Sequence, residues 1–258
     1  MTLIDTHTHL YSSEFDEDRT DIIKEAVALG VEKFFLPNID LDSISGMLAL
    51  QKAFPKHCYP MLGLHPCSVD ENYIEVLKTI ESKIDSTNII AIGEIGIDLY
   101  WDKAFIQQQI EAFKIQINWA KKHKLPIVIH VRAAFDEVFA VLDDLNDDDL
   151  RGVFHCFTGN IQQAKKAISY GGFKLGIGGV VTFKNGGLDK VLNQIELQHL
   201  VLETDAPYLA PTPFRGKRNS STYLPLIAQK LADIYDVAVE YIAESTSKNA
   251  MTLFNIRS

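Results

Sequence analysis

The stretch LPIVIHVR, residues 125–132, carries the pattern from which the fold can be predicted. Its apolar residues follow one another almost without interruption, which is typical of a parallel strand covered on both faces. After it, apolar residues recur at the spacing of one helix face, at Phe135, Val138, Phe139 and Leu142. Pro126, just inside the run, marks the boundary with the preceding helical segment. The pattern therefore indicates a buried strand followed by a helix, which is one β–α unit.

The same unit recurs along the whole chain. Seven further apolar runs cover residues 3–9, 31–38, 58–66, 89–98, 151–157, 173–179 and 200–207. Helical stripes fill the gaps, as at 22–27 and 113–120, and two amphipathic stretches, 223–235 and 238–254, close the chain. Eight units in about 250 residues match a (β/α)8 barrel. We therefore predict an α/β fold, a single TIM-type barrel domain over residues 1–258. A doubly wound open sheet is the alternative, but no Gly-x-Gly-x-x-Gly turn follows the first run.

Composition and charge narrow the class of protein. Hydrophobic residues make up 47% of the 258 residues and charged residues 23%, which is ordinary for a soluble globular protein. The net charge of −9 disfavours a protein that coats long nucleic acids, although a local basic patch could still grip a few phosphates. Three cysteines without a CxxC pair indicate reduced thiols. With no visible signal peptide and no apolar run near the ~18 residues of a membrane span, we expect a cytoplasmic protein without membrane contact.

Polar residues gather where the predicted strands end, which is where barrel enzymes place their active sites. Five of the eight histidines lie there: His7, His9, His65, His130 and His155. Glu94 and Asp205 add carboxylates at the ends of the fourth and eighth runs. The other three histidines, His57, His123 and His199, stand before strands or late in a helix, where a surface or capping role is expected.

Imidazoles and carboxylates without a thiolate predict a site for divalent metal ions. Such a ligand set suits Zn²⁺, Mn²⁺ or Mg²⁺ and does not choose among them. Glu94 lies on a middle strand of the predicted barrel and is placed to bridge two ions. Paired ions roughly 3.5–4 Å apart can activate a water molecule and clamp both the attacking and the leaving oxygen. We therefore expect two divalent metal ions as cofactors.

At this point the chain resembles a known family, the TatD family of metal-dependent hydrolases in the amidohydrolase superfamily. The motifs that carry the resemblance, in order from residue 4 to the end, are DTHTHL, GLHP, GEIGID, LPIVIHVR, FHCFTG, GIGGVVTFKN, LETDAPYLAP and RGKRN. The resemblance implies a (β/α)8-type fold and divalent-metal DNase activity, often as a 3′–5′ exonuclease. It also implies the metal ligands His7, His9, Glu94, His130, His155 and Asp205.

Some members lack the first histidine pair, so its presence here favours a two-metal site. After RN the family often has Glu and Pro, where this chain reads Ser220-Ser221.

Several residues receive roles beside the metal ligands. Asp205 could both bind a metal ion and accept the proton of the attacking water, and with Glu94 it forms the predicted catalytic pair. Asp5 and Glu203 either orient the ligands or are simply buried and hydrogen-bonded. The acidic stretch 143–149 is expected to be a solvated helix end, with calcium binding as a remote alternative. The glycines of 176–187 are expected to be close-packing or loop residues.

Basic and strand-end residues are the candidates for substrate binding. His65 and Arg132 lie at strand ends, and Arg132 could hold a phosphate through its planar guanidinium or form a salt bridge. Lys184 follows the seventh run, where barrels often bind phosphate. Arg215 and Arg218 belong, with Lys217, to a small basic cluster after the eighth run, which could contact phosphates or be a solvated loop.

The leading functional hypothesis is hydrolysis of phosphodiester bonds in DNA, at single-stranded ends, by a dinuclear 3′–5′ exodeoxyribonuclease. The alternative is an ester hydrolase on the same site, such as a D-aminoacyl-tRNA deacylase, because activated water can attack acyl carbon as well as phosphorus. A non-catalytic metal-binding or scaffold protein is a third possibility, which the complete ligand set disfavours. The sequence indicates no protein partner.

Overall fold

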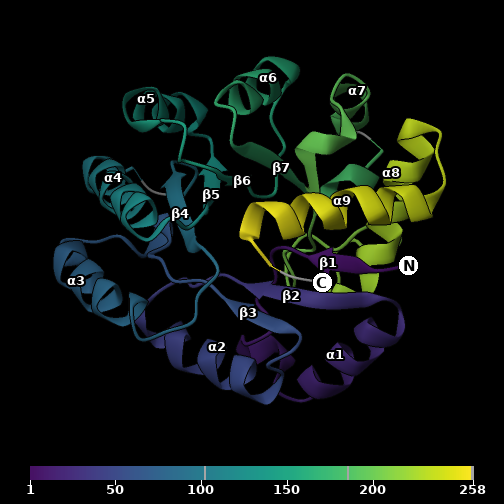
Figure 1. Cartoon of the computed structure of the whole chain (residues 1–258), viewed down its shortest axis with the longest axis horizontal. Coiled ribbons are helices and arrows are strands. Elements are labelled where there is room, and N and C mark those ends of the chain that lie inside the picture. Colours follow the sequence, from purple (N-terminus) through teal and green to yellow (C-terminus); the bar gives the residue numbers. More distant parts are fainter. Residues whose placement is uncertain (102, 185, 257–258) are drawn as a thin grey trace.

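Eight parallel strands form the centre of the molecule in the computed structural model, which describes residues 1–101, 103–184 and 186–256 (Figure 1). The strands are β1 (Leu3–Asp5), β2 (Val31–Leu36), β3 (Cys58–Pro60), β4 (Ile92–Asp98), β5 (Ile127–Arg132), β6 (Gly152–Phe154), β7 (Phe173–Ile177) and β8 (Leu200–Leu202). Each strand lies within one of the eight predicted runs, and several end earlier than the run does. The apolar runs therefore predicted where the strands are more accurately than where they stop.

The strands follow one another around a closed ring. Two parallel sheets, β1-β2-β3 and β4-β5-β6-β7-β8, pair their neighbours in chain order. Isolated bridges join the sheets at both seams, between Leu62 and Ile92 and between Thr8 and Ala206. The second seam brings the first and last strands together, which an open doubly wound sheet does not do. The predicted (β/α)8 barrel is confirmed.

Helices surround the ring on its outer side (Figure 1). They are α1 (Arg19–Ala28), α2 (Leu41–Ala53), α3 (Tyr73–Ile84), α4 (Ile106–His123), α5 (Phe135–Leu145), α6 (Ile161–Ser169), α7 (Leu188–Leu192), α8 (Leu224–Tyr235) and α9 (Val239–Phe254). Short 3-10 helices are η1 (Ser13–Phe15), η2 (Pro66–Ser68), η3 (Gly179–Thr182), η4 (Leu197–His199) and η5 (Ser221–Tyr223). On α5, the buried residues Val138, Val141 and Leu142 form the inward face that the helical stripe predicted. Within the described ranges, no helix has the length and hydropathy that a membrane crossing needs.

An apolar cluster fills the interior of the barrel on the side away from the polar strand ends. Its members from the strands and their approaches are Ile4, Phe35, Met61, Ala91, Val128, Val153 and Val201. Ala250, Leu253 and Phe254 from the end of α9 pack against them, and α9 runs across the ring in Figure 1. On each of the five segments that carry predicted ligands, a cluster residue precedes the ligand, as Val128 precedes His130. This end of the barrel is therefore closed by apolar packing, and the opposite end is left for polar chemistry.

Candidate metal centre

The structure brings the six predicted metal ligands together at the mouth of the barrel. They come from five different strands, namely β1, β4, β5, β6 and β8, or from the segments directly after them. Glu94 and His130 lie within β4 and β5, and His7, His9, His155 and Asp205 follow β1, β6 and β8. Five of them are at most 8% exposed, and His130 is partly buried. Segments far apart in the sequence thus supply one compact cluster, as the argument from strand ends predicted. The placement is shown by the structure, whereas the binding of metal ions by these residues is argued below as a proposal.

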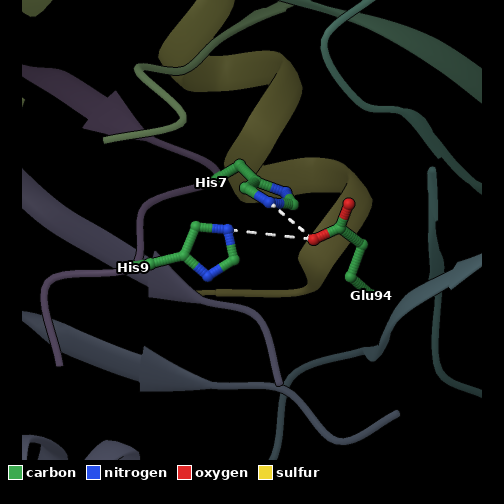
Figure 2. A group of neighbouring side chains, drawn as sticks. All are labelled: His7, His9 and Glu94. Atoms are coloured by element: carbon green, nitrogen blue, oxygen red, sulfur yellow. Dashed lines mark ion pairs between the residues drawn. The ribbon is translucent and has the colours of Figure 1, made fainter. Parts of the chain in front are cut away.

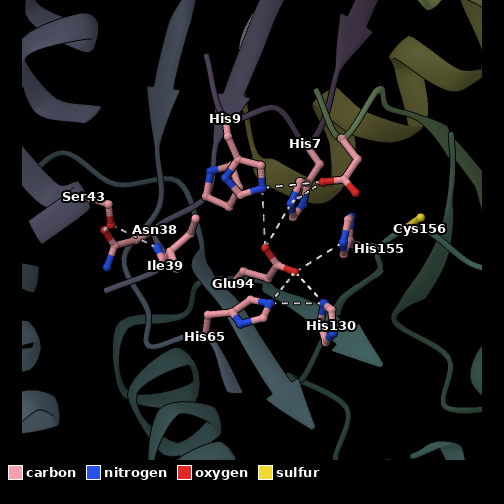
Figure 3. A network of polar contacts seen from close by, with 12 residues as sticks. His7, His9, Asn38, Ile39, Ser43, His65, Glu94, His130, His155 and Cys156 are labelled. Carbon is pink, nitrogen blue, oxygen red and sulfur yellow. Dashed lines mark hydrogen bonds and ion pairs between the residues drawn. The ribbon is translucent and has the colours of Figure 1, made fainter. Parts of the chain in front are cut away.

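Glu94 divides the histidines into two sets, one for each of its carboxylate oxygens. Its Oε2 atom lies 3.1 Å from His7 Nε2 and 3.8 Å from His9 Nε2 (Figure 2). Its Oε1 atom lies 2.8 Å from His130 Nδ1 and 3.3 Å from His155 Nε2 (Figure 3). Asp205 joins the first set, because its Oδ1 atom is 3.5 Å from His9 Nε2 and 3.7 Å from His7 Nε2. One carboxylate therefore faces two separate groups of nitrogen atoms.

In His155 and His9, a hydrogen bond of Nδ1 indicates which ring nitrogen carries the hydrogen. The other nitrogen, Nε2, faces the cluster. The Nδ1 atom of His155 lies 3.0 Å from Glu203 Oε1, and because an ionised carboxylate only accepts, this nitrogen donates. The Nδ1 atom of His9 lies 3.0 Å from the Tyr11 hydroxyl, whose own hydrogen is donated to a backbone carbonyl 2.6 Å away. When neutral, both rings therefore carry their hydrogen on Nδ1 and direct the lone pair of Nε2 at the cluster, which is the form that binds metal ions. The neighbouring carboxylates of Glu203, Glu94 and Asp205 raise the pKa of His155 against the effect of burial.

His130 and His65 are held differently, although both lie beside Glu94. His130 places Nε2 2.8 Å from Asp98 Oδ2, so this nitrogen donates, while Nδ1 faces Glu94 Oε1 at 2.8 Å and His65 Nε2 at 3.3 Å. In His65, by contrast, Nδ1 accepts the Cys67 backbone N–H at 3.0 Å. The neutral His65 ring therefore carries its hydrogen on Nε2, 3.4 Å from Glu94 Oε1. In this arrangement the neutral His65 ring is a hydrogen-bond donor to Glu94, although His65, Glu94 and His130 also lie close enough together to hold a metal ion. Its predicted role towards substrate stays a prediction.

The surroundings of His7 are a separate indication that a cation fits between the predicted ligands. Its side chain is fully buried and neither ring nitrogen has a hydrogen-bond partner, although Nε2 approaches Glu94 Oε2 to 3.1 Å. Buried polar atoms without partners are costly and rare. Burial and the neighbouring His155 lower the pKa of His7, which favours the neutral imidazole. Ligands bound at ~2.1 Å with tetrahedral angles stand about 3.4 Å apart, close to the spacings of this set. The residues therefore fit a divalent cation.

Both carboxylates of the cluster are held in the ionised state. Burial alone would raise the pKa of Glu94, but the positive charge that His155, His7 and His65 carry when protonated holds it well below its usual range. Burial is likewise outweighed at Asp205, whose pKa is lowered by His155, His9 and His7. Two buried negative charges facing histidines form an environment that attracts cations.

Asn38, which the sequence reasoning did not single out, fixes the backbone of Glu94. Its N–H donates to the Gly93 carbonyl and its own carbonyl accepts the Glu94 N–H, both at 3.0 Å. The Asn38 side chain donates to the Gly63 carbonyl at 2.6 Å and accepts the Ser43 hydroxyl at 3.0 Å (Figure 3). Asn38 is the polar residue that ends the second apolar run, so the signal that identified the histidines was present here too.

Asp5 is a buried acceptor for the segment that leads into Asp205. Its carboxylate accepts the Thr204 N–H at 2.9 Å, the Thr204 hydroxyl at 2.7 Å and the Ser221 hydroxyl at 2.7 Å. Burial raises the pKa of Asp5 to about 7 in spite of these bonds. Asp205 itself has a left-handed backbone conformation, with φ of 58°, which is uncommon outside glycine. Asp5 therefore holds the segment that leads into Asp205, and it also accepts the His7 backbone N–H at 3.4 Å.

Glu203 is hydrogen-bonded to the predicted ligand His155. Besides His155 Nδ1, its Oε1 atom accepts the Cys156 N–H. Gly176 on β7 makes this position possible, because a Cβ atom there would stand 2.2 Å from Glu203 Oε2. At this position the glycine-rich stretch serves close packing, as predicted.

Five of the six predicted ligands, all except His7, line a cleft of about 730 Å³. His65 and Arg132, both predicted to bind substrate, line this cleft. Trp101 and Tyr208 also line it. Neither aromatic residue was singled out from the sequence, because nothing in the chain shows that these positions meet at the mouth.

The remaining predicted substrate residues are divided between a pocket and an ion pair. Lys184 and Arg215 line a second pocket of about 440 Å³, formed by the loops after β7 and β8. Arg218 instead points to α1, where its Nη1 atom lies 3.0 Å from Asp18 Oδ1 and its second nitrogen also bonds Asp18. The structure therefore places two of the three basic residues together and gives Arg218 a partner within the chain. Their roles towards a substrate stay predictions.

Comparison with known proteins identifies the family. The family model described as TatD related DNase matches residues 4–255. The chain belongs to this family. It is similar to the uncharacterized metal-dependent hydrolase YabD of Bacillus subtilis, with 36% identity over 98% of this chain and 99% of that protein. It is also similar to the 3′-5′ ssDNA/RNA exonuclease TatD of Salmonella typhimurium, with 32% identity over 98% and 99% of the two chains. The solved structure of YjjV, a TatD homologue from Escherichia coli, has a TM-score of 0.90 and 29% identity, covering 99% of this chain and 98% of YjjV. The predicted family is confirmed.

Proposed function

We propose that this protein is a divalent-metal-dependent phosphodiesterase that removes nucleotides from single-stranded DNA ends, in the 3′–5′ direction. The observation that carries the proposal is the division of Glu94, whose two oxygens face two sets of imidazoles whose lone pairs are directed at the cluster. Such a carboxylate is suited to bridge two cations, and paired cations are a common device for phosphodiester cleavage. The names of the TatD relatives support the same reaction class.

Two sets of residues would hold the ions. His7, His9, Asp205 and Oε2 of Glu94 form the first set, and His130, His155 and Oε1 of Glu94 form the second. When bound, the ions would supply Lewis-acid activation of water and neutralise charge on the phosphate. The carboxylates of Asp98 and Glu203 hold His130 and His155 in the tautomer that this role requires.

Asp205 is the proposed general base. Its Oδ1 atom lies against His9 and His7, so we assign proton acceptance from the attacking water to Oδ2. The lowered pKa of Asp205 keeps the carboxylate ionised, which is the form that can accept a proton. Its buried position beside the cluster limits competition from bulk water.

His65 is the proposed donor to a phosphate oxygen. Its Nε2 hydrogen points toward the cluster, and the Glu94 carboxylate, against the effect of burial, raises the pKa of His65. A donor in this place would neutralise charge on the scissile phosphate. Lys184 and Arg215, in the neighbouring pocket, would hold phosphates further from the bond that is cut.

The test is a panel of substrates assayed with Mg²⁺, Mn²⁺ and Zn²⁺ in parallel with measured metal content. Single-stranded DNA labelled at either end, blunt duplex DNA, a phosphodiester dye substrate and D-aminoacyl-tRNA make up the panel. We expect stepwise loss of nucleotides from the 3′ end of single-stranded DNA, and two metal ions per chain. Cleavage of D-aminoacyl-tRNA with no attack on any phosphodiester would overturn the proposal in favour of the ester hydrolase.

A further inference from the structure

Large apolar side chains are exposed around the mouth of the cleft. Tyr100 is 58% exposed and Trp101 72% exposed, and they follow β4 directly. Tyr208 and Leu209, which follow β8, are 49% and 44% exposed. Trp101, Tyr208 and Leu209 line the cleft itself. Scattered exposed apolar residues are normal, but several gathered at one opening indicate a binding surface.

Tyr100, Trp101 and Arg132, which we call the aromatic rim, contact one another before any ligand arrives. The Arg132 guanidinium lies 3.8 Å from the centre of the Tyr100 ring and 5.3 Å from the centre of the Trp101 ring. The two rings meet edge to face, with centres 4.9 Å apart. These contacts hold the exposed side chains in one arrangement, which reduces the entropy lost when a flat ligand binds. The guanidinium thus faces an aromatic ring, a contact that the sequence did not predict.

The aromatic rim and the His130 half of the candidate metal centre are carried by the same two strands, β4 and β5. Arg132 stands two residues after His130 on β5, and Trp101 stands three residues after Asp98, which bonds His130. Around the ring of strands, β4 and β8 are separated by three strands on either side, so Tyr208 lies across the mouth from Trp101. A nucleotide chain entering the cleft therefore passes the rim next to the candidate metal ions.

We propose that the aromatic rim is a subsite for an unpaired nucleobase, which stacks on Trp101 while Arg132 neutralises the adjoining phosphate. This inference rests on the proposed function, and it adds the part of the substrate that the chain would recognise beyond the phosphodiester itself. An aromatic face and a guanidinium together suit a base and its phosphate. In a duplex, both faces of a base are covered by its neighbours, so such a subsite favours unpaired ends.

The test compares two labelled single-stranded oligonucleotides, identical except that one lacks the bases of its last two 3′ nucleotides. Binding is measured by fluorescence anisotropy in EDTA and in Ca²⁺, and cleavage is measured with the active metal. We expect Trp101→Ala to weaken binding of the intact oligonucleotide by roughly 5- to 150-fold, the usual effect of losing one stacking partner. Binding of the abasic oligonucleotide should hardly change, and Trp101→Phe should retain most of the affinity.

Tyr241→Ala is the matched control, because Tyr241 is a 54% exposed aromatic on α9 that does not line the cleft. Equal weakening of both oligonucleotides by Trp101→Ala, or no weakening of either, would overturn the subsite. So would a wild-type protein that binds neither oligonucleotide. If the wild type distinguishes the two through Trp101 but cleaves neither with any metal, the proposed function fails and the subsite stands. Cleavage without this discrimination removes the subsite alone.

Discussion

Phe254 and His7 are both buried inside the barrel, one at each end. Phe254 packs its ring against Phe35 with centres 4.8 Å apart, within an apolar cluster. His7 is fully buried with neither ring nitrogen hydrogen-bonded. Burial of the first side chain stabilises the fold, whereas burial of the second costs stability unless a ligand compensates it. The apolar end therefore stabilises the fold, and the polar end carries the candidate site. We expect substitutions at the apolar end to lower stability and substitutions at the polar end to lower activity.

The largest effect is expected for Glu94→Gln at the polar end. An amide offers one oxygen and a nitrogen that carries two hydrogens, so it cannot present two negative oxygens to the two sets of histidines. We expect loss of most bound metal and a fall in turnover beyond the ~10⁴-fold upper range for losing a general base. Metal content by mass spectrometry, measured beside turnover, checks this. Retention of two ions by the variant would show that Glu94 is not the bridge, and the surface substitution Glu196→Gln serves as the control.

Asp205→Asn should have the second largest effect, and it should separate proton transfer from metal binding. The substitution keeps the size and one oxygen donor but removes the basic charge. We expect kcat to fall by roughly 10²–10⁴, the usual contribution of general catalysis, while metal ions remain bound. The same two measurements as for Glu94→Gln apply. Near-normal turnover on DNA by a metal-loaded variant would show that Asp205 is not the base.

Phe254→Ala tests the opposite end of the barrel. Phe254 is 4% exposed, and its removal leaves a cavity under the strands. We expect the free energy of unfolding to fall by about 3–5 kcal/mol, the usual range for a buried phenylalanine, with kcat unchanged at low temperature. Urea unfolding and kinetics on the same samples check this. Tyr241→Ala on the same helix should change stability by less than about 0.5 kcal/mol. A kcat that falls in proportion to stability would mean that the two ends are not separable.

The fold could be predicted because its signal is local. Each run of apolar residues is long enough to identify a buried strand by itself, and the barrel rule then places polar strand ends such as His130 and Asp205 at one opening. The exact ends of strands could not be predicted, since β1 stops at Asp5 while His7 and His9 continue along a segment that bonds the β8 loop. Those ends depend on partners distant in the sequence.

Details of the site could not be predicted from the sequence for the same physical reason, because they depend on contacts between residues that are distant in the sequence. The tautomers follow from hydrogen bonds of the ligands to Tyr11, Asp98 and Glu203, which only the folded chain brings into contact. The rim that contains Trp101 depends on the side chain of Arg132, which lies on the next strand. Arg218 looked like a neighbour of Arg215 in function, but it pairs with a carboxylate 200 positions away. Sequence spacing identifies candidate residues, whereas three-dimensional pairing determines which of them are available.

The smallest expected effect concerns these basic residues, and it distinguishes a charge open to substrate from a charge already paired. The double substitution Lys184→Gln/Arg215→Gln removes both cations that line the second pocket. We expect KM for single-stranded DNA to rise several-fold. The slope of log affinity against log salt should fall by about 0.7 for each phosphate contact that is lost.

Arg218→Gln is the matched control, because Asp18 already compensates this charge, and it should leave the salt slope unchanged. Anisotropy titrations over a range of salt concentrations measure the slope for all three proteins. An unchanged slope in the double variant would show that the pocket is only a solvated loop. An equal change in Arg218→Gln would show that the ion pair with Asp18 opens when the nucleic acid binds.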